Sequence, residues 1–346
     1  MSYTNGLDKP TDYFNTKLYT GTGSAQSITG VGFQPEMSWF KQRNTTRGHV
    51  LEDIVRGAGN TLFPHDTSSE TAGGYYLTSF DSDGFTLPSS NVGTNENSGT
   101  YASWNWKAGG SASSNSNGSI TSSVSANTTA GFSISQYTGT GSAGATVGHG
   151  LGVAPKMIIA KGLTYADVWI VGGDNLGGWN KEMYLNFTSA VATNNNAFNG
   201  VTPTSSVFTL GSGNGTNKSG DDYIAYCFAE KKGYSKFGSY TGNGNADGTF
   251  IYTGQKSAFI MIKRTDSTDG WAMFDNKRNP HNTVSQRLWA NESSAEAGTQ
   301  LLDFLSNGFK PRYTNSYFNG SGSSYIYMAF AENPFVTSTG VPATAR

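Results

Sequence analysis

The 346-residue sequence is poor in charge, in cysteine and in long hydrophobic runs. Charged residues make up 14% and the formal net charge is −1, so no basic surface for nucleic acid is expected. The single cysteine, Cys227, excludes intrachain disulfides and multi-cysteine metal sites. Apolar runs such as AFIMI at 258–262 fall far short of the roughly 20 residues that span a bilayer. We therefore expect a soluble protein without membrane insertion and without a cleaved signal.

Helical signals are scarce as well. No long stretch keeps an amphipathic helical stripe with caps, and SSAEAGTQLLDFL at 293–305 is the best candidate for a short helix. In contrast, the 45 glycines, 18 tyrosines and 20 phenylalanines, together with abundant Asn, Ser and Thr, suit turns and pleated strands. The composition therefore predicts an all-β fold.

One sequence unit occurs three times. Its opening hexapeptide YTGTGS stands at 19–24 and 137–142, and a near copy, YTGNGN, begins at Tyr240. An apolar run ending in Lys follows in each copy, and a Trp, Trp169 or Trp271, follows that run in the second and third. The apolar runs are PEMSWFK (35–41), PKMIIAK (155–161) and SAFIMIK (257–263). Each copy ends with a closing segment: YASWNWKAG (101–109), YIAYCFAEK (223–231) or YIYMAFAENPF (325–335). Because the markers keep one order over whole-domain lengths, we infer a triplicated domain-sized unit rather than a solenoid.

The triplication predicts three tandem antiparallel β-sandwich domains of jelly-roll-like type, since each copy holds short strands between frequent turn signals. The closing segments of the second and third copies, at 223–231 and 325–335, are almost continuously apolar, which predicts a strand buried on both faces. Residues 110–130 are rich in Gly, Ser and Asn, which predicts a linker, or an edge strand if SITSSVS pairs. The predicted parts are an extension (1–18), sandwiches (19–109, 131–233 and 234–335) and a tail (336–346).

Motifs that resemble reactive sites have structural explanations. DSDG at 81–84 resembles the start of a calcium loop, but the third copy has LSNG at 305–308, so a tight turn is predicted. The four histidines lack ligand spacing. Cys227 aligns with Asn105 and Ala329 in the closing strand and is expected in the core. We predict no metal, cofactor or catalytic residue, hence no enzyme, although carboxylates that meet only in the fold leave glycoside hydrolysis as an alternative.

Aromatic residues on polar loops that the copies do not share are candidate surface contacts. Tyr and Trp in such loops stack on sugars or on protein, and packing against the core is the alternative for each. The candidates are Tyr75, Tyr76, Trp179, Tyr184, Tyr313 and Tyr317.

Long phrases of the chain resemble a family of uncharacterised repeat domains in tailed, mostly marine, bacteriophages. The resemblance covers about residues 5–335 and implies a structural protein of the virion, associated with the tail or fibres, without known catalytic residues. It also implies a location in the virion, after assembly in the host cytoplasm, and contacts with other virion proteins. The phrases are YFNTKLYTGTGSAQSITGVGFQP (13–35), NTTAGFSISQYTGTGSAGATVGHGLGVAPKMIIAK (127–161), SKFGSYTGNGNADGTFIYTG (235–254) and AFIMIKRTDSTDGWAMFDNKR (258–278).

The sequence thus favours a non-enzymatic virion protein, a tail-associated or fibre component that presents a host-attachment surface. Its expected partners are other virion proteins and a glycan or protein of the host surface, with copies arranged as a homotrimer that binds multivalently. No heptad or shaft-like repeat is present, so a capsid-decorating or head-fibre protein is the first alternative. A carbohydrate-active enzyme or free lectin is the second.

Overall fold

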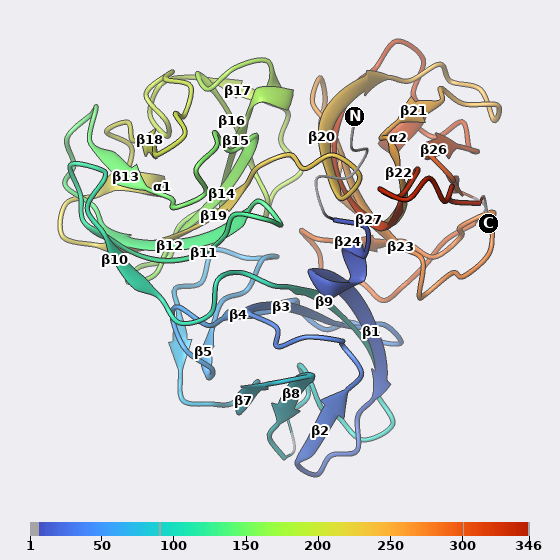
Figure 1. The fold of residues 1–346 in the computed structure, drawn as a ribbon, viewed down its shortest axis with the longest axis horizontal. Helices are drawn as coiled ribbons and strands as arrows, with labels where there is room; N and C mark the ends of the chain where they lie inside the picture. The colour runs from blue at the N-terminus through green and yellow to red at the C-terminus, as the bar shows by residue number, and fades with distance from the viewer. Residues whose placement is uncertain (1–6, 90, 300, 345–346) are drawn as a thin grey trace.

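The computed structural model describes residues 7–89, 91–299 and 301–344. The described chain is 41% strand and 4% helix, and its sheets are antiparallel, which confirms the all-β sandwich fold. Figure 1 shows three lobes around a common centre, one for each sequence copy. We call the copies repeats 1, 2 and 3 (residues 14–109, 113–233 and 234–335). Parts of the predicted extension and tail, residues 1–6 and 345–346, lie outside the described residues.

Repeat 1 contains a larger sheet of order β1-β9-β3-β4, a smaller sheet of order β2-β8-β7, and the short pair β5-β6. Ile28 and Phe85 of the smaller sheet pack with Phe40 and Val50 of the larger one in an outer core. The strands are β1 (Phe14–Thr20), β2 (Gln26–Thr29), β3 (Met37–Gln42), β4 (Val50–Asp53), β5 (Asn60–Thr61), β6 (Thr71–Ala72), β7 (Ser79–Asp81), β8 (Gly84–Leu87) and β9 (Thr100–Trp106).

Repeat 2 contains an eight-stranded sheet of order β10-β11-β12-β19-β14-β15-β16-β17 and the pair β13-β18. Two of its strands, β10 and β11, come from the segment 110–130, and β11 pairs along β12, so this segment adds strands to the sheet. The strands are β10 (Ser113–Asn115), β11 (Ser122–Asn127), β12 (Phe132–Thr138), β13 (Thr146–Gly148), β14 (Met157–Gly162), β15 (Ile170–Gly173), β16 (Lys181–Tyr184), β17 (Ala192–Thr193), β18 (Val207–Thr209) and β19 (Asp222–Phe228).

Repeat 3 contains a sheet of order β20-β27-β22-β23-β24 and a smaller one of order β21-β26-β25. Its strands are β20 (Ser235–Thr241), β21 (Ile251–Tyr252), β22 (Gln255–Arg264), β23 (Trp271–Asp275), β24 (Leu288–Trp289), β25 (Leu302–Leu305), β26 (Gly308–Pro311) and β27 (Ser324–Pro334). The described helices are single turns: η1 (Pro10–Asp12), η2 (Asp174–Leu176), α1 (Asn214–Asn217) and α2 (Ser316–Asn319). No helix in the described residues is long and apolar enough to cross a membrane.

The predicted helix over 293–305 is wrong, because its last four residues, Leu302–Leu305, form strand β25. Leu302 and Phe304 alternate into the outer core of repeat 3, while Asp303 and Leu305 are only half-buried. This two-residue period matches a strand, and pairing with β26 outweighs local helix propensity. Gln300 lies outside the described residues.

The closing strands β9, β19 and β27 are buried on both faces, which confirms the prediction made for the second and third copies. Each pairs on one side with the opening strand and on the other with the strand of the apolar run. In β19, Tyr226 faces a core shared by all repeats, whereas its neighbour Cys227 faces the outer core of repeat 2. Cys227 is fully buried, which confirms its prediction as a core residue.

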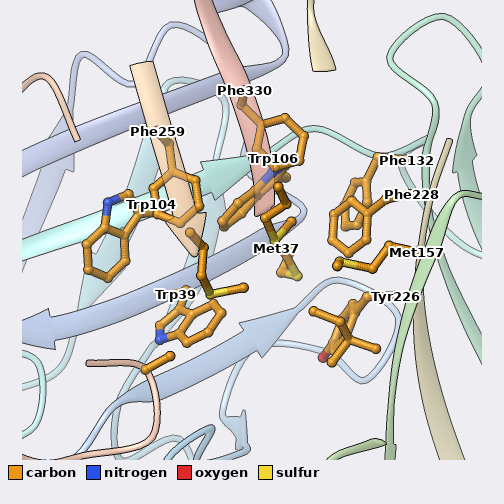
Figure 2. Packing of buried hydrophobic residues seen from close by; sticks show 14 of the residues in the cluster. Met37, Trp39, Trp104, Trp106, Phe132, Met157, Tyr226, Phe228, Phe259 and Phe330 are labelled. Atoms are coloured by element: carbon orange, nitrogen blue, oxygen red, sulfur yellow. The ribbon is translucent and has the colours of Figure 1, made fainter. Parts of the chain in front are cut away.

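The larger sheets of the three repeats turn one face toward a single central core. Figure 2 shows aromatic and methionine side chains from all three repeats meeting there. Phe330 of repeat 3 lies 5.6 Å from Trp106 of repeat 1 and 6.0 Å from Phe228 of repeat 2, between ring centroids. The repeats therefore share apolar packing. Their independence as tandem domains and their jelly-roll likeness remain predictions.

Candidate functional site

The opening YTG loop is held in place by the closing segment of the same repeat. In repeat 1 the Tyr19 ring stacks on Tyr101 at 5.0 Å, and buried Asn95 accepts the Thr22 amide at 3.0 Å. A Cβ atom on Gly21 would lie 2.2 Å from the Glu96 carbonyl oxygen, so only glycine fits. The corresponding sets in the other repeats are Tyr137, Tyr223, Asn217, Thr140 and Gly139, and Tyr240, Tyr325, Asn319, Asn243 and Gly242. The recurring motif thus builds the fold.

DSDG also has a structural role. Ser82 and Asp83 form the turn between β7 and β8, and the Asp83 carboxylate accepts the amides of Gly30 and Gly32 at 2.9 and 2.7 Å. This confirms the predicted tight turn. In the described part of the chain, no group of three or more His, Cys, Asp and Glu residues is placed to hold a metal ion.

A buried lysine crosses each junction between repeats. Lys161 Nζ donates to its neighbour Gly162 at 2.9 Å and to the Thr67 carbonyl of repeat 1 at 3.4 Å. Lys263 reaches Thr188 of repeat 2, and Lys41 reaches Ser293 of repeat 3, in the same way. Burial lowers the pKa of each of these three lysines to about 8. The lysine that ends each apolar run is therefore a junction residue.

At each junction, a ring N–H also donates across to the same neighbouring repeat that the lysine reaches. His49 replaces the Trp of the other repeats: its Nδ1 accepts Trp39 Nε1 at 2.8 Å, and its Nε2 lies 2.9 Å from the Trp289 carbonyl. Nε2 therefore donates, and burial keeps the pKa of His49 well below its usual value, so the ring is neutral. The corresponding bonds are Trp169 to the Phe63 carbonyl and Trp271 to the Tyr184 carbonyl. These bonds make Phe63, Tyr184 and Trp289 equivalent positions.

Repeat 2 has an open groove beside its equivalent aromatic residue. The groove has a volume of about 330 Å³, and its lining includes Tyr184, the carboxylates of Asp167 and Glu182, and Gly215 of α1. Burial, with the nearby Glu182 charge, raises the pKa of Tyr184 to about 12, so its hydroxyl stays protonated and donates to Glu182 Oε1 at 3.0 Å. Polar acceptors beside an aromatic face are typical of a binding surface.

Repeat 1 has a groove at the corresponding place with different chemistry. Its volume is about 270 Å³, and its lining includes Arg47, Phe63, His65 and Tyr76. Burial lowers the pKa of His65, so the imidazole is neutral at physiological pH. Arg47 forms an ion pair with Glu96 at 3.4 Å.

Repeat 3 occupies the corresponding place with its own side chains. The Arg287 guanidinium lies 4.1 Å from the Trp289 ring centroid, and Tyr317 packs edge-on against Trp289 at 5.2 Å. Arg287 and Glu182 both stand two residues before the equivalent aromatic residue. Tyr317 stands two residues before Asn319, where repeats 1 and 2 have Gly93 and Gly215. One position in the fold therefore carries three different surfaces.

A single family model matches residues 9–334 and spans all three repeats. The chain belongs to the DUF7483 family, described as a domain of unknown function. No curated protein and no solved structure matches the DUF7483 chain. The family description names no virion, so the link to phage particles remains a prediction.

The structure distributes the six candidate surface aromatics of the DUF7483 chain over all three repeats. Tyr76 and Tyr184 line the two grooves, and Tyr317 occupies the corresponding place in repeat 3. Tyr75 and Tyr313 are exposed outside these grooves, at 60% and 40%. The candidates thus form no single site.

The structure corrects the candidate Trp179, which is buried and only 3% exposed and so is not a surface contact. It packs edge-on against Phe198 at 5.4 Å and donates from Nε1 to Asp174 Oδ1 at 2.6 Å. The buried ring belongs to the outer core of repeat 2, which matches the packing alternative.

Sequence reasoning missed Glu182, Asp167 and Arg287 of the DUF7483 chain. Charged residues carry no periodic signal, and Asp167 reaches the groove from the loop between β14 and β15, whereas Glu182 lies on strand β16. Alignment of Tyr184 with Trp289 would have exposed the exchange of Glu182 for Arg287. That alignment depends on the hydrogen bonds from ring N–H groups to carbonyls at the junctions, which only the structure reveals.

Proposed function

We propose that the chain is a non-enzymatic structural protein of a phage virion, a tail-associated or fibre component that presents a host-attachment surface. One observation carries the attachment role: the repeats share their core strands, their opening loops and their junction lysines, whereas the groove positions differ between repeats. A fixed scaffold with variable outward surfaces suits recognition. The sequence resemblance to repeat domains of tailed bacteriophages supports the virion assignment.

In this proposal, one face of the protein contacts other virion proteins while the grooves face a glycan or protein of the host surface. Several copies on one particle, as a homotrimer or through the symmetry of the particle, would raise the effective concentration of weak sites. Tyr76 of repeat 1 and Tyr184 of repeat 2 are the aromatic residues best placed for contact, because each lines a groove.

A capsid-decorating or head-fibre role is the second candidate. Its support is the three-lobed shape in Figure 1, in which the described residues form no extended shaft. Such a shape needs only a docking face and an outward face.

The experiment is to locate the protein in purified phage particles by cryo-electron microscopy and to add recombinant protein to host cells before infection. Tail location with inhibition of infection supports the attachment role, and capsid location without inhibition supports decoration. Absence from particles rejects both. Turnover of a defined glycan by the purified protein would instead favour the carbohydrate-active enzyme, and glycan binding without turnover the free lectin.

A further inference from the structure

A largely buried carboxylate, Glu182, lines the repeat 2 groove, and the protein's own donors reach only one of its two oxygens. Glu182 on β16 is 5% exposed and lines the groove. Its Oε1 accepts the Tyr184 hydroxyl at 3.0 Å and the Asn194 amide at 2.9 Å. Among the described residues, no hydrogen bond or ion pair involves Oε2 of Glu182. Oε2 opens into the groove, where water or a donor group of a ligand can reach it.

Repeat 3 shows which group fits this place. There Arg287 stands at the position of Glu182, with its guanidinium 4.1 Å from the Trp289 ring and 5.6 Å from the Tyr317 ring. Repeat 3 thus places its own planar cation over the equivalent aromatic side chain. Repeat 2 keeps the aromatic residue as Tyr184, but it has a carboxylate in place of the arginine and Gly215 in place of the tyrosine.

We propose that the repeat 2 groove binds the arginine side chain of a partner protein. A guanidinium can lie on the Tyr184 ring while it donates to Glu182 Oε2, and its planar fork matches a carboxylate. The described lining of the groove contains the carboxylates of Asp167 and Glu182 and no Lys, Arg or His, so an anionic ligand is disfavoured.

The surroundings of the groove fit a protein rather than a free cation. Phe187 is 43% exposed and packs edge-on against Tyr184 at 6.2 Å. An exposed aromatic residue beside an arginine pocket is typical of a protein interface, in which aromatic and arginine side chains carry much of the binding energy. This inference goes beyond the proposed function, because it holds for a partner in the virion or on the host.

The test is ligand-observed NMR with the full chain and N-acetyl-arginine methylamide as probe. Its neutral isostere, N-acetyl-citrulline methylamide, keeps the shape and removes the charge. We expect arginine binding with a dissociation constant on the order of 1 mM and citrulline binding weakened about tenfold or more. This comparison uses the unaltered protein, so its outcome does not depend on the folding of a variant.

Two substitutions and a control locate the binding. Glu182→Gln keeps an acceptor for Tyr184 and Asn194 but removes the charge, and it should weaken arginine binding about tenfold. Tyr184→Leu should weaken it severalfold through loss of the aromatic face. Glu292→Gln, a carboxylate in repeat 3, should leave binding unchanged.

Equal binding of the arginine and citrulline probes would overturn the proposal, as would arginine binding that Glu182→Gln leaves intact. A methyl glycoside that binds the groove while the arginine probe does not would identify a saccharide site instead, and would also overturn it.

Discussion

At the scale of residues, one junction between repeats replaces a charged network with apolar side chains. At the junction of repeats 1 and 2, Arg56 pairs with Asp53 at 2.6 Å and with Glu70 at 2.9 Å, and Asp53 accepts the Tyr226 hydroxyl of repeat 2. Asp275, Arg278, Glu296 and Trp104 form the same network between repeats 3 and 1. The junction of repeats 2 and 3 has Gly173, Leu176, Val191 and Met328 at the corresponding positions. All four positions of the network therefore differ together between this junction and the other two.

The Arg56→Leu substitution should destabilise the protein by about 3–5 kcal/mol, because it leaves two carboxylates without their cation. The fourfold variant Asp53→Gly, Arg56→Leu, Glu70→Val and Tyr226→Met copies the apolar junction and should recover most of that loss. Urea unfolding of both variants measures the difference. A fourfold variant no more stable than Arg56→Leu would contradict this explanation.

The three junction lysines predict an unusual dependence of stability on pH. Burial lowers the pKa of each to about 8, whereas an unfolded chain keeps these protons up to pH about 10.5. Unfolding therefore takes up protons between these values, and the free energy of unfolding should rise as pH increases through this window. Each lysine contributes about 3 kcal/mol over the full window, from about 1.4 kcal/mol per pH unit.

Urea unfolding at pH 7, 8, 9 and 9.5 checks this prediction. Lys161→Met should reduce the rise by about a third, since it removes one of three equivalent groups. Below pH 8 the slope from these lysines should vanish. Stability that falls between pH 8 and 9.5 would contradict the prediction.

At the scale of elements, each opening loop depends on one buried asparagine. Asn217 at the end of α1 accepts the Thr140 amide at 2.8 Å and donates to the carbonyls of Ser142 and Gly211 at 3.0 and 2.6 Å. Asn217→Ala leaves these backbone groups without their partner and should cost about 2–4 kcal/mol. Asn319→Ala is the matched change in repeat 3, with the same expected cost. Thermal unfolding measures both, and a loss below about 1 kcal/mol in each would contradict the role.

The elements show where sequence reasoning succeeds and where it ends. The apolar runs and closing segments identify β3, β14 and β22 beside β9, β19 and β27, because buried central strands leave a continuous apolar signal. Residues 293–305 mislead, since Leu302–Leu305 form a hairpin with β26, and this pairing outweighs the local helix propensity. The grooves escape detection, because their charged residues come from separate segments of the chain and meet only in the fold.

At the scale of the whole molecule, the central core makes the repeats mutually dependent. Repeat 2 turns Ile224, Tyr226 and Phe228 of its closing strand toward that core. Residues 110–233 expressed alone would expose this face, so we expect aggregation or self-association, measured by size-exclusion chromatography with light scattering. A stable monomer with dispersed amide resonances would instead support the independent tandem domains predicted from sequence.

The same construction has a consequence for dilution. Three separate subunits around a shared core fall apart as their concentration drops, because assembly depends on the third power of monomer concentration. Joining the three copies in one chain makes their association intramolecular, so the arrangement persists at any concentration. Covalent linkage also frees each copy from fitting identical neighbours, and this is what allows one junction to be apolar and two to be charged.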